Sequence, residues 1–216
     1  MYARISLWLG LGLASTLAQA AGIAQLYAPK LPEGSAWLRV VNPADDIQQV
    51  RVGDSAAQAL SARAMIASPF QAVDARRPLP VTVNGRELKD LKAPANAFVT
   101  LILDRDPAAA PRLVIDPPPR GKDLKAELNV YNLGNGCAQA DIKLANNGTV
   151  FSQIAFNGQA QRTINPVQAT LIGHCGQAAS LPLQLEPFQA GDRYSLFLVG
   201  SAQHPRLVGL VDKTAP

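Results

Sequence analysis

The sequence IGHCG at 172–176 places His174, one of two histidines, directly beside Cys175, one of two cysteines. A histidine next to a thiol can act as the base that activates a cysteine nucleophile. A cysteine in an exported protein can instead form a disulfide, because its compartment is oxidising. The two interpretations predict different proteins, an enzyme or a cross-linked binding module.

A second possible nucleophile is Ser55, in the sequence Gly53-Asp54-Ser55. Hydrolases and acyltransferases of the SGNH type place such a serine after a strand and at the start of a helix. The serine also needs a histidine base oriented by an acid, usually within an Asp-x-x-His motif. Neither His174 nor His204 has an aspartate three residues before it. A turn at a strand end, where glycine and aspartate are favoured, explains this sequence better.

The two cysteines, Cys137 and Cys175, are predicted to form a disulfide. Neighbouring side chains on an extended strand point to opposite faces, so His174 is poorly placed to activate Cys175. Both cysteines lie in glycine-flanked stretches, and two cysteines allow a single intramolecular bridge. Closing a loop of this length is worth roughly 3–4 kcal/mol in the chain-entropy model. We therefore expect a structural disulfide in the second half of the chain.

Metal, cofactor and nucleic-acid binding find little support in the sequence. No spaced Cys/His cluster occurs, so we expect no metal site. Asp104 and Asp106 alternate at strand spacing and could hold calcium, but a solvated loop is the simpler interpretation. No phosphate-binding glycine loop or dinucleotide fingerprint is present, so we expect no cofactor. The formal net charge is +4 and the basic residues are spread over both halves, which argues against a nucleic-acid partner.

The first twenty residues have the pattern of a signal peptide. Arg4 gives a positive start, an apolar stretch follows, and Ala18-Gln19-Ala20 matches the small-x-small cleavage pattern. The segment is too short to be a convincing transmembrane helix, and no later stretch has 18 consecutive apolar residues. We expect a signal peptide over 1–20 and an exported protein that does not span the membrane.

The remaining chain is predicted to be all-β, with two tandem small β-sandwich domains joined by a short proline-rich linker. Apolar runs of five to eight residues recur between turn residues, and residues 127–132 alternate with the period of a half-buried strand. Three consecutive prolines at 117–119 exclude a helix or a central strand there. The predicted parts are an N-terminal sandwich at 21–115, the linker at 116–121 and a C-terminal sandwich at 122–216. The alanine-rich stretch 55–66 is the one segment predicted to be helical.

The two halves of the chain also resemble each other in sequence. LRVVN at 38–42 and LNVYN at 128–132 each open a half, and Pro-Arg-Leu-Val recurs at 111–114 and 205–208 near the end of each half. The two offsets, 90 and 94 residues, are nearly equal. This agreement favours an internal duplication of a unit whose length suits a β-sandwich.

Trp37 and Arg39 are candidates for contact with a partner. They alternate with Leu38 and Val40 along the first predicted strand, so the two pairs lie on opposite faces of the sheet. If the face of Trp37 is exposed, the tryptophan is a contact site. The alternative is that Trp37 covers a sheet edge or packs at the junction between the domains.

The stretch LYAPKLPEGSAWLRVVNP at 26–43, followed by VRVGDS at 50–55, resembles the opening of the AlgF family. Members of this family are periplasmic accessory proteins of bacterial alginate O-acetylation. The resemblance consists of a Leu-Tyr-x-Pro stretch, a Pro-x-Gly-Ser before the first strand, an asparagine at the end of that strand, and a later Val-Gly-Asp. The matching positions are Leu26, Tyr27, Pro29, Pro32, Gly34, Ser35, Arg39, Val40, Asn42, Val52, Gly53 and Asp54.

The resemblance implies a non-catalytic protein of the periplasm that is required for O-acetylation of an exported polysaccharide. Its implied partners are SGNH-type acetyltransferase proteins and a membrane O-acyltransferase, with the polysaccharide as a further ligand. The candidate partner contacts are Tyr27, Trp37, Arg39 and Asn42. The cysteine pair is not part of the alginate pattern, which raises the related WssG proteins of cellulose acetylation. The polymer, alginate or cellulose, is therefore left open.

Two specific hypotheses on function remain, beside the generic possibility of a sandwich adhesin or chaperone-like module. The first is the accessory protein, in which the catalytic Gly-Asp-Ser belongs to the partners. The second is an exported SGNH-like esterase or acetyltransferase that uses Ser55 itself. A Ser55→Ala variant separates them, because only the second hypothesis requires the hydroxyl.

Overall fold

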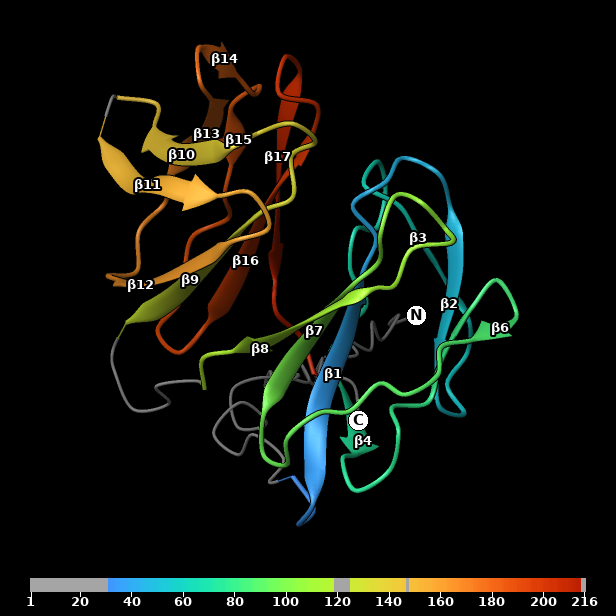
Figure 1. Ribbon diagram of the computed structural model, residues 1–216. Helices are drawn as coiled ribbons and strands as arrows, with labels where there is room; N and C mark the ends of the chain where they lie inside the picture. Colours follow the sequence, from blue (N-terminus) through green and yellow to red (C-terminus); the bar gives the residue numbers. More distant parts are fainter. Residues whose placement is uncertain (1–30, 119–124, 147, 215–216) are drawn as a thin grey trace, which may run out of the picture. The chain divides into compact units, whose positions relative to one another are not determined.

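The structure is a computed structural model that describes residues 31–118, 125–146 and 148–214 (Figure 1). The predicted signal peptide at 1–20 and the candidate contact Tyr27 lie outside the described residues. The first half contains the strands β1 (Ser35–Val41), β2 (Gln48–Val52), β3 (Gln58–Leu60), β4 (Gln71–Asp74), β5 (Val81–Val83), β6 (Arg86–Glu87), β7 (Phe98–Ile102) and β8 (Arg112–Asp116). The second half contains β9 (Ala126–Asn132), β10 (Gln139–Leu144), β11 (Thr149–Ala155), β12 (Gln159–Ile164), β13 (Thr170–Cys175), β14 (Ala178–Ala179), β15 (Leu183–Gln184), β16 (Arg193–Gly200) and β17 (Pro205–Val211).

Each half consists of two sheets with the same strand order. In the first half these sheets are β4-β1-β7-β8 and β3-β2-β5-β6, and in the second half they are β12-β9-β16-β17 and β11-β10-β13-β14, with β15 paired to β13. The parallel pair β1/β7 of the first half corresponds to the parallel pair β9/β16 of the second. The all-β prediction is thus confirmed, and the repeated topology agrees with an internal duplication.

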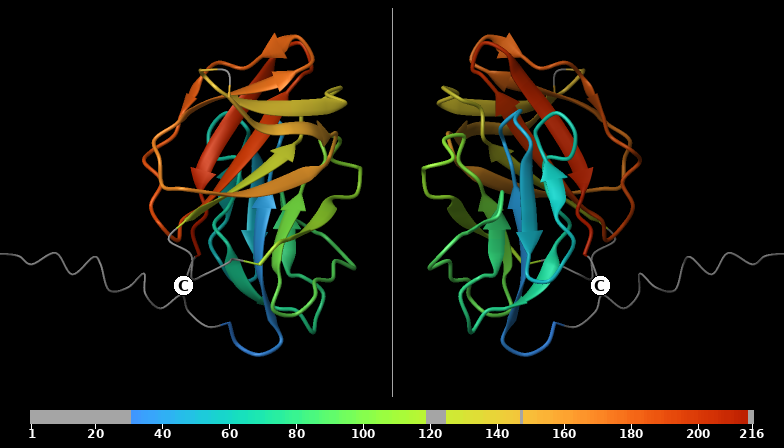
Figure 2. Two further views of the ribbon diagram at one scale, coloured as in Figure 1. Left: turned by 90° about the vertical axis from the view of Figure 1, so that its left-hand side faces the viewer. Right: turned by 90° about the vertical axis from the view of Figure 1, so that its right-hand side faces the viewer.

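Three hydrophobic clusters show how the sheets pack. One cluster lies between the two sheets of the first half, and a second lies between the two sheets of the second half. A third joins the halves, because it combines Val41, Ile102 and Val114 with Tyr131 and Phe197. We call β4-β1-β7-β8 and β12-β9-β16-β17 the inner sheets, since they face each other across this third cluster; Figure 2 gives two further views of the strands.

The alternation of residues along β1 explains why this strand is buried along its whole length. Ala36, Leu38 and Val40 point into the core of the first half, as the sequence predicts. Trp37 and Arg39 point to the opposite face and are 7% and 1% exposed. That face is covered by the inner sheet of the second half, so both faces of β1 exclude water.

The helix predicted at 55–66 is wrong. This stretch contains β3, which pairs antiparallel with β2, and then a turn in which the amide of Ser61 donates to the carbonyl of Met65 at 2.9 Å. Leu60 and Ile66 are buried in two different hydrophobic clusters. Pairing with β2 and burial of these side chains override the helix propensity of the alanines, which is a weak preference.

The linker prediction is only partly covered by the structure. Asp116, placed in the linker at 116–121, is the last residue of β8, and residues 119–124 lie outside the described part. The boundaries of the two predicted domains stay a prediction. Within the described residues, no helix is long and apolar enough to cross a membrane.

Candidate functional site

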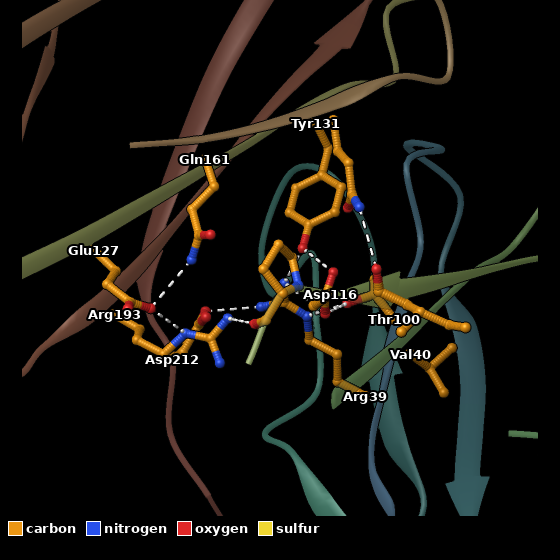
Figure 3. Close-up of polar contacts among 12 residues, drawn as sticks. Arg39, Val40, Thr100, Asp116, Glu127, Tyr131, Gln161, Arg193 and Asp212 are labelled. Atoms are coloured by element: carbon orange, nitrogen blue, oxygen red, sulfur yellow. Dashed lines mark hydrogen bonds and ion pairs between the residues drawn. The ribbon is translucent and has the colours of Figure 1, made fainter. Parts of the chain in front are cut away.

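The most elaborate polar site is a buried network centred on Arg39, between the two inner sheets (Figure 3). The guanidinium donates from Nε to the Thr100 hydroxyl at 2.8 Å, from Nη1 to Asp212 at 2.7 Å and from Nη2 to the Tyr131 hydroxyl at 2.9 Å. Thr100 lies opposite Arg39 on β7, whereas Tyr131 and Asp212 belong to the second half. One side chain therefore binds both halves of the molecule.

Asp116 completes the network from the end of β8. Its two carboxylate oxygens accept hydrogen bonds from the hydroxyls of Thr100 at 2.6 Å and Tyr131 at 2.5 Å, and Arg39 Nη2 lies 4.0 Å away. Burial raises the pKa of Asp116, although the positive charge of Arg39 opposes this shift. Burial by itself lowers the pKa of Arg39. The nearby Asp212, Tyr131 and Asp116 outweigh the effect of burial, so the pKa of the guanidinium is raised.

A second buried cation, Arg193 at the start of β16, lies at the same end of the junction. Its Nη2 donates to the carbonyl of Pro117 at 3.1 Å, and its Nε lies 3.3 Å from Glu127. The guanidinium carbon is 4.8 Å from the centre of the Phe98 ring, within the range of a cation–π contact. Arg39 makes a similar contact with Phe70 at 4.5 Å. Aromatic rings and carboxylates thus surround both cations.

The duplication reveals an asymmetry in this network. Arg39 pairs with Thr100 in the first half, and at the corresponding place in the second half Asn129 pairs with Ser195. Both polar atoms of the Asn129 side chain and the hydroxyl of Ser195 are buried without a hydrogen-bond partner. Asp212 is the counterpart of Asp116, and its Oδ2 is likewise buried without a hydrogen-bond partner. Each such group costs about 1–3 kcal/mol in lost hydration.

A pocket of about 270 Å³ opens along the seam beside this network. It lies between the segment 64–70 of the first half and residues 208–213 of the second, and Arg39 and Asp212 are among its lining residues. The seam is closed at one end where the amide of Phe70 donates to the carbonyl of Lys213 at 2.8 Å. The hydrogen bonds of the network beside this pocket run between residues of the two inner sheets.

Ser55 does not have the surroundings of an activated nucleophile. It lies in the turn after β2, where its hydroxyl contacts backbone groups: the Val52 amide at 3.4 Å and the Ala56 carbonyl at 3.5 Å. No histidine among the described residues forms a hydrogen bond with it. No helix starts at Ser55, in contrast to the SGNH arrangement.

The two cysteines form the predicted disulfide, with 5.6 Å between their Cα atoms. The bridge joins the loop after β9 to the end of β13, within the second half. His174 lies on β13 opposite Asp141 of the neighbouring strand, and burial, helped by Lys143, lowers its pKa. No group of three or more possible metal-ligating side chains occurs in the part of the chain that the structure describes.

The three candidate partner contacts that the structure describes, Trp37, Arg39 and Asn42, make internal contacts instead of forming a patch on the surface. Trp37 stacks on Phe98 at 6.2 Å, and Arg39 belongs to the buried network. Asn42 is fully buried; its side-chain nitrogen donates to the carbonyls of Asp46 and Leu60, and its oxygen accepts from a backbone amide two residues later. Asn132 at the end of β9 makes the same kinds of bond. Their role as partner contacts stays a prediction.

Sequence reasoning missed the partners of Arg39, which are Thr100, Asp116, Tyr131 and Asp212. A signal for them exists in the alternation of each strand: Thr100 shares a face with Phe98 and Ile102, and Tyr131 shares one with Glu127 and Asn129. Polar residues that alternate with core residues indicate a solvated face as readily as a buried junction. The signal therefore identifies the shared face but not its burial.

Comparison with known proteins places the chain in a family. A family model described as alginate O-acetyl transferase AlgF matches residues 8–194. The chain belongs to the AlgF family. It is 29% identical over 198 residues to the alginate biosynthesis protein AlgF of Pseudomonas putida, which covers 91% of this chain and 88% of that protein. It is 31% identical over 204 residues to AlgF of Azotobacter vinelandii, covering 92% and 90%.

A solved structure of the C-terminal domain of AlgF from P. aeruginosa aligns with 41% of this chain and 99% of that domain, with 23% identity and a TM-score of 0.37. The AlgF family takes part in alginate biosynthesis and O-acetylation. The resemblance first found in residues 26–55 is thereby confirmed over most of the chain.

Proposed function

We propose that this AlgF-family protein is a periplasmic, non-catalytic accessory protein of exopolysaccharide O-acetylation. It acts by binding the proteins that carry and transfer acetyl groups, namely SGNH-type acetyltransferase proteins and a membrane O-acyltransferase. The names of its relatives favour alginate as the polymer. The cellulose branch remains the alternative polymer, because the disulfide departs from the alginate pattern described above.

The surroundings of Ser55 carry this proposal. A serine hydroxyl becomes an effective nucleophile when an adjacent base removes its proton. The hydroxyl of Ser55 has backbone groups as its hydrogen-bond partners among the described residues. The Arg39 network supports the same conclusion, because its donors and acceptors are committed to holding two sheets together. Two sandwiches joined through buried hydrogen bonds suit a protein that holds its partners in place.

The first experiment replaces Ser55 with alanine in a strain whose own copy of the gene is deleted, and measures the acetyl content of the exported polymer. We expect wild-type acetylation, and we expect the purified wild-type protein not to hydrolyse p-nitrophenyl acetate. Ser152→Ala, an exposed serine on β11, is the matched control. Loss of acetylation in a folded Ser55→Ala protein, together with turnover of the ester by the wild type, would refute the accessory role.

A second experiment tests the partners directly. The mature protein, immobilised through a C-terminal tag, is mixed with the purified SGNH-type acetyltransferase from the same acetylation system. We expect a saturable complex that survives the Ser55→Ala change, because the hydroxyl has no role in binding. The same assay is run with the membrane O-acyltransferase. If the immobilised protein retains neither the SGNH-type acetyltransferase nor the membrane O-acyltransferase, the adaptor function is wrong.

A further inference from the structure

The C-terminal sandwich has a pocket of about 500 Å³ at one end, between its inner and outer sheets. The pocket lies where β9, β11 and β13 begin and where β10 and β12 end, so the strands frame its opening. Its volume is within the range of about 300–1,000 Å³ that small-molecule sites have. Nothing in the proposed accessory role accounts for it.

The floor of this pocket is the hydrophobic core itself. Leu128, Leu171 and Phe188 lie at its base and belong to the core cluster of the second half, with 1%, 1% and 4% exposure. The apolar surface that a ligand meets is that of the less buried lining residues Leu144, Val150, Ile164, Val167 and Ala169. Phe188 is fixed by an edge-to-face contact with Tyr194, with 4.2 Å between ring centres. A ligand that reaches this floor meets apolar surface and gains affinity with each methylene that it buries.

The rim of the pocket carries positive charge. Among the described residues that line it, the charged ones are Lys125 and Arg162, both exposed, and no carboxylate is among them. Arg162 lies on the face of β12 that is directed toward the core, opposite Leu128 of β9. Its Nη1 donates to the carbonyl of Val150 on β11 at 3.0 Å. This bond holds the guanidinium across the opening and leaves its other N–H groups for a ligand. Neither cation forms an ion pair within the part of the chain that the structure describes.

An apolar floor below a cationic rim selects an amphipathic anion. We propose that this pocket binds a single acyl chain that ends in a carboxylate. The chain lies against Val150, Ile164 and Val167 above the core, and the carboxylate lies at Arg162 and Lys125. A neutral sugar has too few methylenes to use the floor, and a cationic amphiphile is repelled at the rim. The proposal concerns a site separate from the Arg39 junction and does not depend on the accessory function.

The test is isothermal titration calorimetry of the mature protein with hexanoate, octanoate and decanoate below their micelle concentrations. We expect saturable binding of decanoate with one molecule per chain, and affinity that rises about fourfold for each added methylene that is buried. Decyltrimethylammonium, which has the same chain and the opposite charge, should bind more weakly. Absence of decanoate binding at millimolar concentration, or equal affinity for the two head groups, would overturn the proposal.

Variants at the pocket and a matched control complete the experiment. Arg162→Gln and Lys125→Gln should each weaken decanoate binding two- to fivefold, as expected for exposed ion pairs. Ala169→Phe fills the pocket and should abolish binding, whereas Lys89→Gln, an exposed lysine of the first half, should leave it unchanged. If Ala169→Phe does not fold, Arg162→Glu at the exposed rim serves instead and should remove the preference for decanoate over decyltrimethylammonium. Decanoate binding that is unchanged in whichever of these two variants folds would refute the site.

The same variants distinguish a free fatty acid from a membrane surface. Vesicles of phosphatidylglycerol offer negative charge without a free acyl chain, so we expect no binding of the protein to them in a sedimentation assay. The contrary result has two parts: the protein sediments with these vesicles even when Ala169→Phe or Arg162→Glu is introduced, and calorimetry detects no decanoate binding. That result would show general attraction to an anionic surface and would contradict the pocket.

Discussion

Replacing Arg39 with methionine removes the cation that, among the described residues, lies within 4.0 Å of both Asp116 and Asp212. The methionine refills much of the space, so the loss is one of charge and hydrogen bonds and not of volume. The side chains of Asp116 and Asp212 are 0% and 4% exposed, so neither carboxylate can recover its hydration without opening the junction. We expect a large loss of stability, because the variant leaves the buried carboxylate of Asp212 without its ion-pair partner and takes the positive charge away from Asp116.

The magnitude follows from the contacts. Three hydrogen bonds of 2.7–2.9 Å are lost, and each bond to a charged group contributes about 1.5–3 kcal/mol. Methionine packing offsets part of this sum, and removal of one partner of a buried ion pair typically costs about 3–5 kcal/mol. At roughly 2–4 °C per kcal/mol for a chain of this size, the melting temperature should fall by roughly 6–20 °C.

Urea unfolding of the mature protein measures the effect by two signals. Once residues 1–20 are removed, Trp37 is the single tryptophan, so its fluorescence reports on the inner sheet of the first half, while circular dichroism reports on both halves. Arg206→Met is the matched control: Arg206 on β17 pairs with Asp45 of the first half at an exposed site, where an ion pair contributes up to about 1 kcal/mol.

We expect Arg39→Met to lose several times more stability than Arg206→Met and to separate the two unfolding signals. Adding Asp212→Asn to Arg39→Met should recover part of the loss, because one of the buried charges is removed. If Arg39→Met lies within 1 kcal/mol of the control, the guanidinium does not hold the junction, and the reasoning fails.

Three further predictions concern the same structure. Asn129→Leu removes a buried amide that has no hydrogen-bond partner, so it should leave the unfolding free energy unchanged or raise it by up to about 3 kcal/mol. Asn132→Leu removes an amide that is fully hydrogen-bonded, so it should lower the unfolding free energy. Equal losses of the two variants in urea unfolding would contradict this. Replacing Cys137 and Cys175 by alanine together opens a loop with a sequence separation of 38 and should cost about 4 kcal/mol by the chain-entropy model; a melting temperature that reductant leaves unchanged would argue against it. Burial raises the pKa of Asp116 above 3.8, so the stability contributed by its protonated form is present below that pH and is lost as the pH rises through the folded-state pKa. The unfolding free energy of the wild type minus that of Asp116→Asn should therefore fall as the pH rises from 3.8, and a rise would refute the assignment.

Much of the fold could be predicted from local patterns. The period-two alternation at 127–132 corresponds to β9, although this strand is buried on both faces and not half-buried as expected, and the repeated motifs near 38 and 128 begin the two inner sheets. The disulfide followed from counting cysteines in a chain with an export signal. Each of these features depends on residues close in sequence or on a single possible pairing, which is why the sequence was sufficient.

The candidate site could not be predicted in the same way, since it depends on which sheet covers which face. Alternation placed Trp37 and Arg39 together on the face away from the first core, and this was correct. It could not show that the second inner sheet covers that face. Asp116 illustrates the difficulty: three prolines follow it, so the sequence placed it in a linker, yet its carboxylate lies in the centre of the network.

The junction is not symmetric, although the two halves share one topology. Arg39 of the first half has the uncharged Asn129 as its counterpart in the second half. Arg39 therefore serves the carboxylates of both copies, Asp116 and Asp212. The cost is the set of buried groups around Asn129 and Ser195 that lack hydrogen bonds. The asymmetry therefore makes each half electrostatically incomplete without the other, and it favours one fixed pairing of the two sheets over the alternatives that a symmetric duplication would allow.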